Sequence, residues 1–90
     1  MKILAVCGMG IGTSVLLKMN AERVMEQLDI EGEVDATDLE TALRPDSPAQ
    51  IVLCTPELKP QLDGIRAEIV TVDNVFDLGE LSQKLQKSLL

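Results

Sequence analysis

The chain contains no histidine, tryptophan or tyrosine, and Phe76 is its single aromatic residue. Without histidine, the chain alone cannot form a His-activated nucleophile, a histidine metal site or a phosphohistidine. Single-stranded nucleic acid would find almost no aromatic side chains on which to stack its bases. Positive charge is also scarce, because 8 Lys and Arg stand against 15 Asp and Glu, for a net charge of -7. These absences predict that nucleic acid is not a partner.

Cysteine and long apolar runs are equally limited. Cys7 and Cys54 are too few for a zinc cluster or a disulfide-stapled secreted domain, so we expect no metal, no cofactor and a reducing cytoplasm. No stretch approaches the ~20 apolar residues of a membrane span, and the N-terminus makes a poor targeting signal, so no direct membrane insertion is expected. With 90 residues and 46% hydrophobic content, the sequence predicts a single domain over 1–90.

Strand and helix patterns alternate along the chain. Strands are predicted at 2–6, 33–37, 50–54 and 68–72, and helices at 13–28 and 39–43. A further helix is expected to start at Thr55-Pro56-Glu57, and Asp77 is expected to cap the last helix. Such alternation favours right-handed crossovers between parallel strands. We therefore expect an α/β fold, a three-layer, Rossmann-like open sheet of four parallel strands in order 2-1-3-4 with helices on both faces. Chemistry in such sheets gathers at the carboxyl ends of the strands.

Cys7 follows the first predicted strand and begins a glycine-rich loop, whose other residues are Gly8, Met9, Gly10, Ile11, Gly12, Thr13 and Ser14. The glycines allow backbone amides to converge on an anion, and the two hydroxyls and the start of a helix add further donors. The first acid after Cys7 is Glu22. These surroundings favour a thiolate and predict a cysteine that attacks or carries phosphate. The alternative is an inert cysteine that ends a strand beside a tight glycine turn.

Other phosphate-binding loops fit less well. A Walker loop needs a lysine before its Ser or Thr, and Gly12-Thr13-Ser14 has none. The spacing of Gly8, Gly10 and Gly12 is not that of the dinucleotide fingerprint. Small cysteine phosphatases have an arginine where this chain has Thr13, and without that clamp hydrolysis should be poor. A loop that accepts phosphate but hydrolyses it slowly suits a phosphate carrier.

The loop sequence CGMGIGTS is similar to the active-site loop of enzyme IIB components of the bacterial sugar phosphotransferase system (PTS). It most resembles the ascorbate-type branch, and the galactitol-type branch is next. The resemblance implies that Cys7 is the catalytic residue and that Gly8 to Ser14 bind its phosphate.

By the same resemblance, a phosphohistidine of enzyme IIA is the phosphoryl donor. The acceptor is a sugar, ascorbate-like or a sugar alcohol, taken up through the membrane enzyme IIC. The protein would be cytoplasmic and would meet the inner face of the membrane transiently through enzyme IIC. A cysteine phosphatase-like or arsenate-reductase-like enzyme and a non-catalytic anion-binding regulatory module remain alternatives.

A few other residues carry weaker expectations. Cys54 is expected to be a buried core residue, with a reversible link to Cys7 as the alternative. Thr55 is expected either to add a hydroxyl at the mouth of the site or to cap a helix. Lys18 and Arg23 either steer a phosphorylated partner or form part of a solvated helix face.

Overall fold

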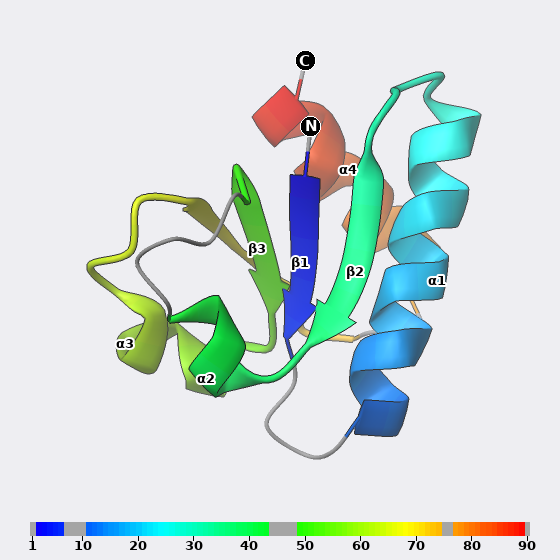
Figure 1. The fold of residues 1–90 in the computed structure, drawn as a ribbon. Helices are drawn as coiled ribbons and strands as arrows, with labels where there is room; N and C mark the ends of the chain where they lie inside the picture. The colour runs from blue at the N-terminus through cyan, green and yellow to red at the C-terminus, as the bar shows by residue number, and fades with distance from the viewer. Residues whose placement is uncertain (1, 7–10, 44–48, 75–76, 90) are drawn as a thin grey trace.

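A computed structural model describes residues 2–6, 11–43, 49–74 and 77–89, and in this part of the chain four parallel strands form one sheet (Figure 1). The strands are β1 (Lys2–Val6), β2 (Glu33–Thr37), β3 (Ile51–Cys54) and β4 (Glu68–Thr71), and the helices are α1 (Ile11–Gln27), α2 (Leu39–Ala42), the 3-10 helix η1 (Pro56–Leu58), α3 (Lys59–Leu62) and α4 (Leu78–Leu89). Their order across the sheet is β2-β1-β3-β4, which confirms the predicted order and fold class.

The strand β1 lies at the centre of the sheet, between β2 and β3. Its apolar residues alternate between two cores, with Ile3 and Ala5 on one face and Leu4 and Val6 on the other. All four are buried, because helices cover both faces of the sheet. This explains why β1 is an almost continuous apolar run rather than an alternating one.

The helices α1 and α4 cover one face and lie behind the sheet in Figure 1. The helix α1 packs on the core through Leu17, Ala21 and Val24, and α4 adds Leu81 and Leu85. After α1, the chain reverses at Asp29, which adopts a left-handed φ of 57°. The N–H of Ile30 then donates to the carbonyl of Met25 at 2.9 Å, which closes the helix end.

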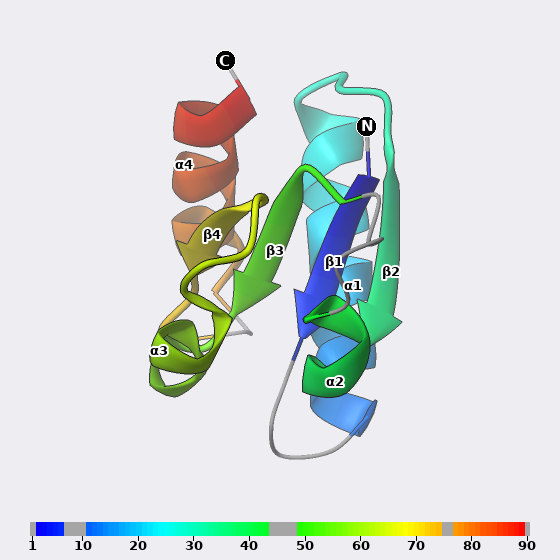
Figure 2. The same cartoon turned by 60° about the vertical axis from the view of Figure 1, so that its left-hand side comes forward.

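The opposite face is covered by shorter helices, as Figure 2 shows after a 60° turn. Asp38 caps α2, since its Oδ1 accepts the N–H of Thr41 at 2.8 Å. The predicted helix start at Pro56 is confirmed, but the segment splits into η1 and then α3. Pro60, near the start of α3, has no N–H to continue the helix from its preceding turn. These short helices therefore pack mainly through Ala42, Leu58 and Leu62.

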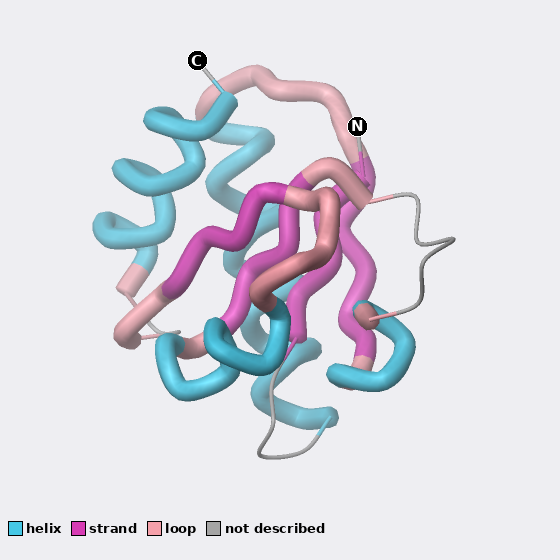
Figure 3. Tube along the Cα trace, turned by 90° about the vertical axis from the view of Figure 1, so that its left-hand side faces the viewer, coloured by secondary structure: helices cyan, strands magenta, loops and turns pink. Residues whose placement is uncertain are grey.

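All four strands run the same way, so their carboxyl ends meet at one edge, hereafter the carboxyl edge. In Figure 1 this is the lower edge, where α1 also begins. The tube view of Figure 3 shows α2 and α3 beside the same edge, each following a strand end. The fold therefore gathers several loop and helix starts around the end of β1.

We predict that Leu17→Ala lowers the free energy of unfolding by about 2–5 kcal/mol. Leu17 is fully buried in the core under α1, so truncation leaves a cavity. The matched variant Met19→Ala changes a side chain two residues on that is half exposed, and should cost no more than about 0.5 kcal/mol. Urea unfolding followed by circular dichroism measures both values. Equal losses in the two variants would contradict this account of the core.

Candidate functional site

The end of β1 is the centre of the carboxyl edge. Val6, its last residue, is in register with Thr37 of β2 and with Cys54 of β3, and Cys54 is in register with Thr71 of β4. The residues that directly follow the other strand ends therefore lie around the carboxyl end of β1, after which the predicted phosphate loop comes in the sequence. This is the arrangement in which open parallel sheets bind ligands.

The first half of that loop, Cys7 to Gly10, lies outside the described residues. The second half forms the start of α1, which begins at Ile11, two residues earlier than the sequence predicted. Gly12, Thr13 and Ser14 therefore belong to the first turn, where backbone N–H groups have no acceptor within the helix. The first turn holds no acidic residue, so no carboxylate there competes with a bound anion.

The two hydroxyl residues of the loop differ in exposure. Thr13 is partly exposed at the carboxyl edge, whereas Ser14 is 1% exposed and already engaged in an interaction within the protein. The structure thus brings Thr13 and Ser14 together at one helix start. Their contact with a phosphate remains a prediction.

Carboxylates follow the other strand ends. Asp38 follows β2, Glu57 lies two residues beyond Thr55 after β3, and Asp73 follows β4 by two residues. Thr55 is the N-cap residue of η1, as one of its two expected roles has it, but its hydroxyl makes no capping bond and instead donates to Oε1 of Glu57 at 2.7 Å. This hydrogen bond lowers the pKa of Glu57. The start of α1, whose first-turn N–H groups favour an anion, therefore shares the carboxyl edge with these three carboxylates.

Glu80 fixes the connection from β4 to α4, a role that the sequence did not indicate. Its two oxygens each accept a backbone N–H at 3.0 Å, from Asp73 and from Asn74. Lys84 adds a bond to Oε2 at 2.9 Å and also donates to the carbonyl of Thr71. The backbone bond from Asp73, followed by Lys84, holds the pKa of Glu80 at about 2. One carboxylate thus ties the end of β4 to the first turn of α4.

A depression of about 440 Å³ lies beside the site at the outer edge of β2. Residues from β1, α1, β2 and α2 line it: Leu4, Val15, Lys18, Asp35, Ala36, Thr37 and Thr41. Lys18 bridges to Glu22 at 4.0 Å and lowers the pKa of Asp35 after the larger effect of Lys2. The sequence analysis missed this feature, because its lining comes from four separate elements.

Cys54 is fully buried at the end of β3, among apolar residues of the core under α2 and α3. This confirms the expectation of a buried core cysteine. A reversible link to Cys7 stays a prediction, since Cys7 lies outside the described residues.

Among the residues with a described placement, no three acidic or cysteine side chains are grouped as metal ligands. None of the helices in the same ranges has both the length and the apolar character to cross a bilayer.

Comparison with known proteins assigns this geometry to a family. The model of the family described as "PTS system, Lactose/Cellobiose specific IIB subunit" matches residues 2–87. The chain belongs to this family. It is also 33% identical over 88 residues to the "Ascorbate-specific PTS system EIIB component" of Mycoplasma pneumoniae, with 97% of this chain and 93% of the relative covered. Enzyme IIB components are phosphotransferases of sugar uptake and generally work with enzymes IIA and IIC.

A solved structure supports the fold independently. The lactose-specific IIB component domain of the PTS from Streptococcus pneumoniae superposes with a TM-score of 0.64 at 19% identity, covering 99% of this chain and 94% of that one. At this identity the likeness concerns the architecture alone. It agrees with the parallel sheet and its helices on both faces.

We predict that Glu80→Gln removes a pH-dependent part of this enzyme IIB's stability. The folded protein holds the pKa of Glu80 at about 2, below its ordinary value of 4.5, so the charged form stabilises the fold. That stability is complete above pH 4.5 and is lost as the pH falls towards 2. Because the group is partly solvated, we expect about 1 kcal/mol at pH 7.

Urea unfolding between pH 7 and pH 2.5 measures this effect. The difference between wild type and Glu80→Gln should shrink as the pH falls. Asp63→Asn, which alters an exposed carboxylate after α3, is the matched control and should leave the pH profile of the wild type unchanged. A constant difference between wild type and Glu80→Gln across the range would contradict the assigned role of Glu80.

Proposed function

We propose that Cys7 is the phosphoryl carrier of this enzyme IIB. Its thiolate attacks the phosphorus of a phosphohistidine on enzyme IIA, so that a sulfur–phosphorus bond forms while the phosphorus–nitrogen bond breaks. A hydroxyl oxygen of the sugar then attacks the same phosphorus. The sulfur–phosphorus bond breaks, the thiolate is restored and the hydroxyl proton is released. No cofactor or metal is required for either step.

The position of Cys7 in the chain carries this proposal. It directly follows the central strand of the sheet in a chain whose match to the IIB family spans 2–87, and α1 begins four residues later. The amides of the first turn of α1 and the helix dipole favour a negative charge at this point. The same field would lower the pKa of a thiol and shelter a phosphate. We propose Gly8, Met9, Gly10, Ile11, Gly12, Thr13 and Ser14 as the phosphate-binding residues.

The acceptor is the finer part of the proposal. The relative from Mycoplasma pneumoniae is named as ascorbate-specific, at 33% identity over nearly the whole chain. We infer an ascorbate-like sugar or a sugar alcohol as the substrate. It would be bound by the membrane enzyme IIC, while this chain acts in the cytoplasm and reaches the membrane only through that partner.

The alternatives are less well supported. A cysteine phosphatase needs a guanidinium beside the phosphate to hold its equatorial oxygens. Two arginines have a described placement. Arg23 lies in the later turns of α1, and Arg66 precedes β4, so both are away from the carboxyl edge. Membership of a phosphotransferase family also argues against a purely regulatory anion-binding module.

We predict that phosphorylated enzyme IIA transfers one phosphoryl group to the wild type and to Cys54→Ala, but not to Cys7→Ser. Cys54→Ala is the matched control, because it removes the chain's other thiol from a buried position on the neighbouring strand. Intact mass after incubation with the general PTS components and enzyme IIA measures the gain, and peptide mapping locates it.

Two results would contradict the proposal. One is equal phosphorylation of Cys7→Ser and the wild type, which would move the acceptor to another residue. The other is rapid hydrolysis of an aryl phosphate by the wild type, which would instead favour the hypothesis of a cysteine phosphatase-like enzyme. Circular dichroism of each variant separates loss of transfer from loss of fold.

A further inference from the structure

Three large apolar side chains are exposed among the described residues, and all lie on the two helices that flank β2. Val15 and Met19 of α1 are 40% and 53% exposed, and Leu43, at the end of α2, is 43% exposed. Val15 and Met19 are four residues apart and so share one face of α1. Figure 2 shows α1 and α2 on opposite faces of the sheet beside β2. The three exposed apolar residues thus all belong to the segments that adjoin β2, on the two faces of the sheet.

The depression at the edge of β2 joins these two helices. Val15 and Lys18 line it from α1, Thr41 lines it from α2, and Ala36 and Thr37 line it from β2. Since β2 is an outer strand of the described sheet, no strand of that sheet covers this edge. Its volume of about 440 Å³ has room for a protruding apolar side chain of another protein. An exposed apolar patch beside such a depression is typical of an interaction site.

The charge around this edge is strongly negative. The segment 29–43 contains no lysine or arginine and carries six of the 15 acids: Asp29, Glu31, Glu33, Asp35, Asp38 and Glu40. Nearby, Lys2 bridges to Glu33 and Asp35, and Lys18 bridges to Glu22. Arg23 adds one more positive charge, four residues after Met19 on α1, and the six acids still outnumber these three basic residues.

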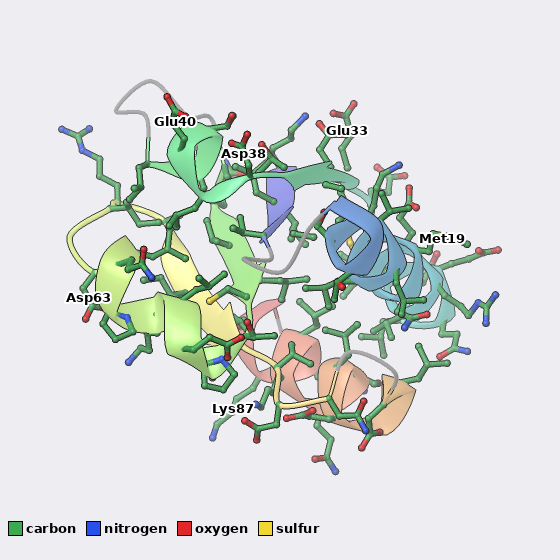
Figure 4. The ribbon with its side chains drawn as sticks, turned by 90° about the horizontal axis from the view of Figure 1, so that it is seen from below. Met19, Glu33, Asp38, Glu40, Asp63 and Lys87 are labelled. Atoms are coloured by element: carbon green, nitrogen blue, oxygen red, sulfur yellow. The ribbon has the colours of Figure 1, made fainter. Side chains whose placement is uncertain are left out.

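Figure 4 shows how the charges are distributed. Glu33, Asp38 and Glu40 lie along the β2 side, and Met19 lies on the adjoining side of α1. Asp63 and Lys87 lie away from them, on α3 and α4. The labelled acids of this edge therefore follow β2 and α2, and Met19 lies beyond them on α1.

This charge narrows the choice of partner. A second copy would bring the same acids against the first, and like charges facing each other oppose pairing. An anionic lipid surface is repelled in the same way. The complementary surface is a protein segment in which lysine or arginine flanks an apolar side chain. Cytoplasmic loops of membrane proteins have this character, because they carry an excess of lysine and arginine.

We propose that the β2-edge surface, formed by Val15, Met19, Leu43, Glu33, Asp35 and Glu40, docks the basic cytoplasmic loops of enzyme IIC. The inference rests on the proposed function, which requires the chain to reach a sugar held in the membrane. The acids attract the basic loops of enzyme IIC, whereas the anionic lipid around enzyme IIC repels this chain. Association is therefore directed to enzyme IIC rather than to the lipid. An apolar side chain of the loop, inserted into the depression, would fix the position of enzyme IIC relative to the carboxyl edge.

The test uses the enzymes IIA and IIC with which the chain reconstitutes sugar phosphorylation. Enzyme IIC in nanodiscs of zwitterionic lipid is immobilised, and its Kd for each variant is measured by biolayer interferometry at low and high salt. The charge variant is Glu40→Lys, matched by Asp63→Lys, which makes the same change on an exposed residue after α3. The apolar variant is the double change Val15→Ser and Met19→Ser.

We predict that Glu40→Lys and the double variant each weaken binding to enzyme IIC about tenfold or more, while Asp63→Lys stays within about twofold of wild type. The wild-type Kd should rise with salt. Phosphoryl transfer from enzyme IIA, measured separately, should continue in all variants. These results together support the docking surface.

Other outcomes overturn it. Equal Kd values for Glu40→Lys and Asp63→Lys would show that the β2 edge makes no contact, and equal binding to empty nanodiscs would assign the attraction to lipid. Loss of transfer from enzyme IIA with intact binding to enzyme IIC would assign the surface to the donor. Failure of the wild type to accept phosphate overturns the proposed function instead. The binding assay distinguishes that case, because it measures contact with enzyme IIC without phosphoryl transfer.

Discussion

The parallel register of β1 with both neighbouring strands is the constraint on which the rest of the structure depends. It places Val6 beside Thr37 and beside Cys54, so three strand ends lie level at one edge. Helices can then cover both faces, and every connection that leaves a carboxyl end starts near the same point. A register shift of one residue would turn Ile3 and Leu4 to the wrong cores and move the start of the loop. The candidate chemistry therefore depends on backbone pairing before it depends on any side chain.

Much of the fold could be predicted because its signals are local. The apolar runs of β1 and β3 follow from burial on both faces, and the leucine stripe of α4 from helical periodicity. Asp38 caps α2 through a bond that spans three residues, which a short sequence motif can encode. The start of α1 was less predictable, since glycine favours a loop by propensity and yet Gly12 lies within the first turn here.

The candidate site was only partly predictable, for a different reason. The loop could be identified from Cys7 onwards because its residues are adjacent in the sequence. The role of Glu80 could not, because the N–H groups that donate to it lie across a turn, in a connection whose geometry only the sheet defines. The depression beside β2 draws on four elements, and exposed apolar residues such as Met19 look in sequence like core residues. Features assembled by tertiary contact leave no short-range pattern.

The central place of β1 has a consequence for how the protein is made. Its residues are synthesised before those of its two pairing partners, at 33–37 and 51–54, and α4, which covers one face, comes last of the described elements. While these partners remain within the ribosome, β1 cannot complete its hydrogen bonds, and closing such long loops is slow. A nascent chain would thus expose this apolar run until both partner strands have emerged. The protein becomes competent as a phosphotransferase only when the second half has emerged.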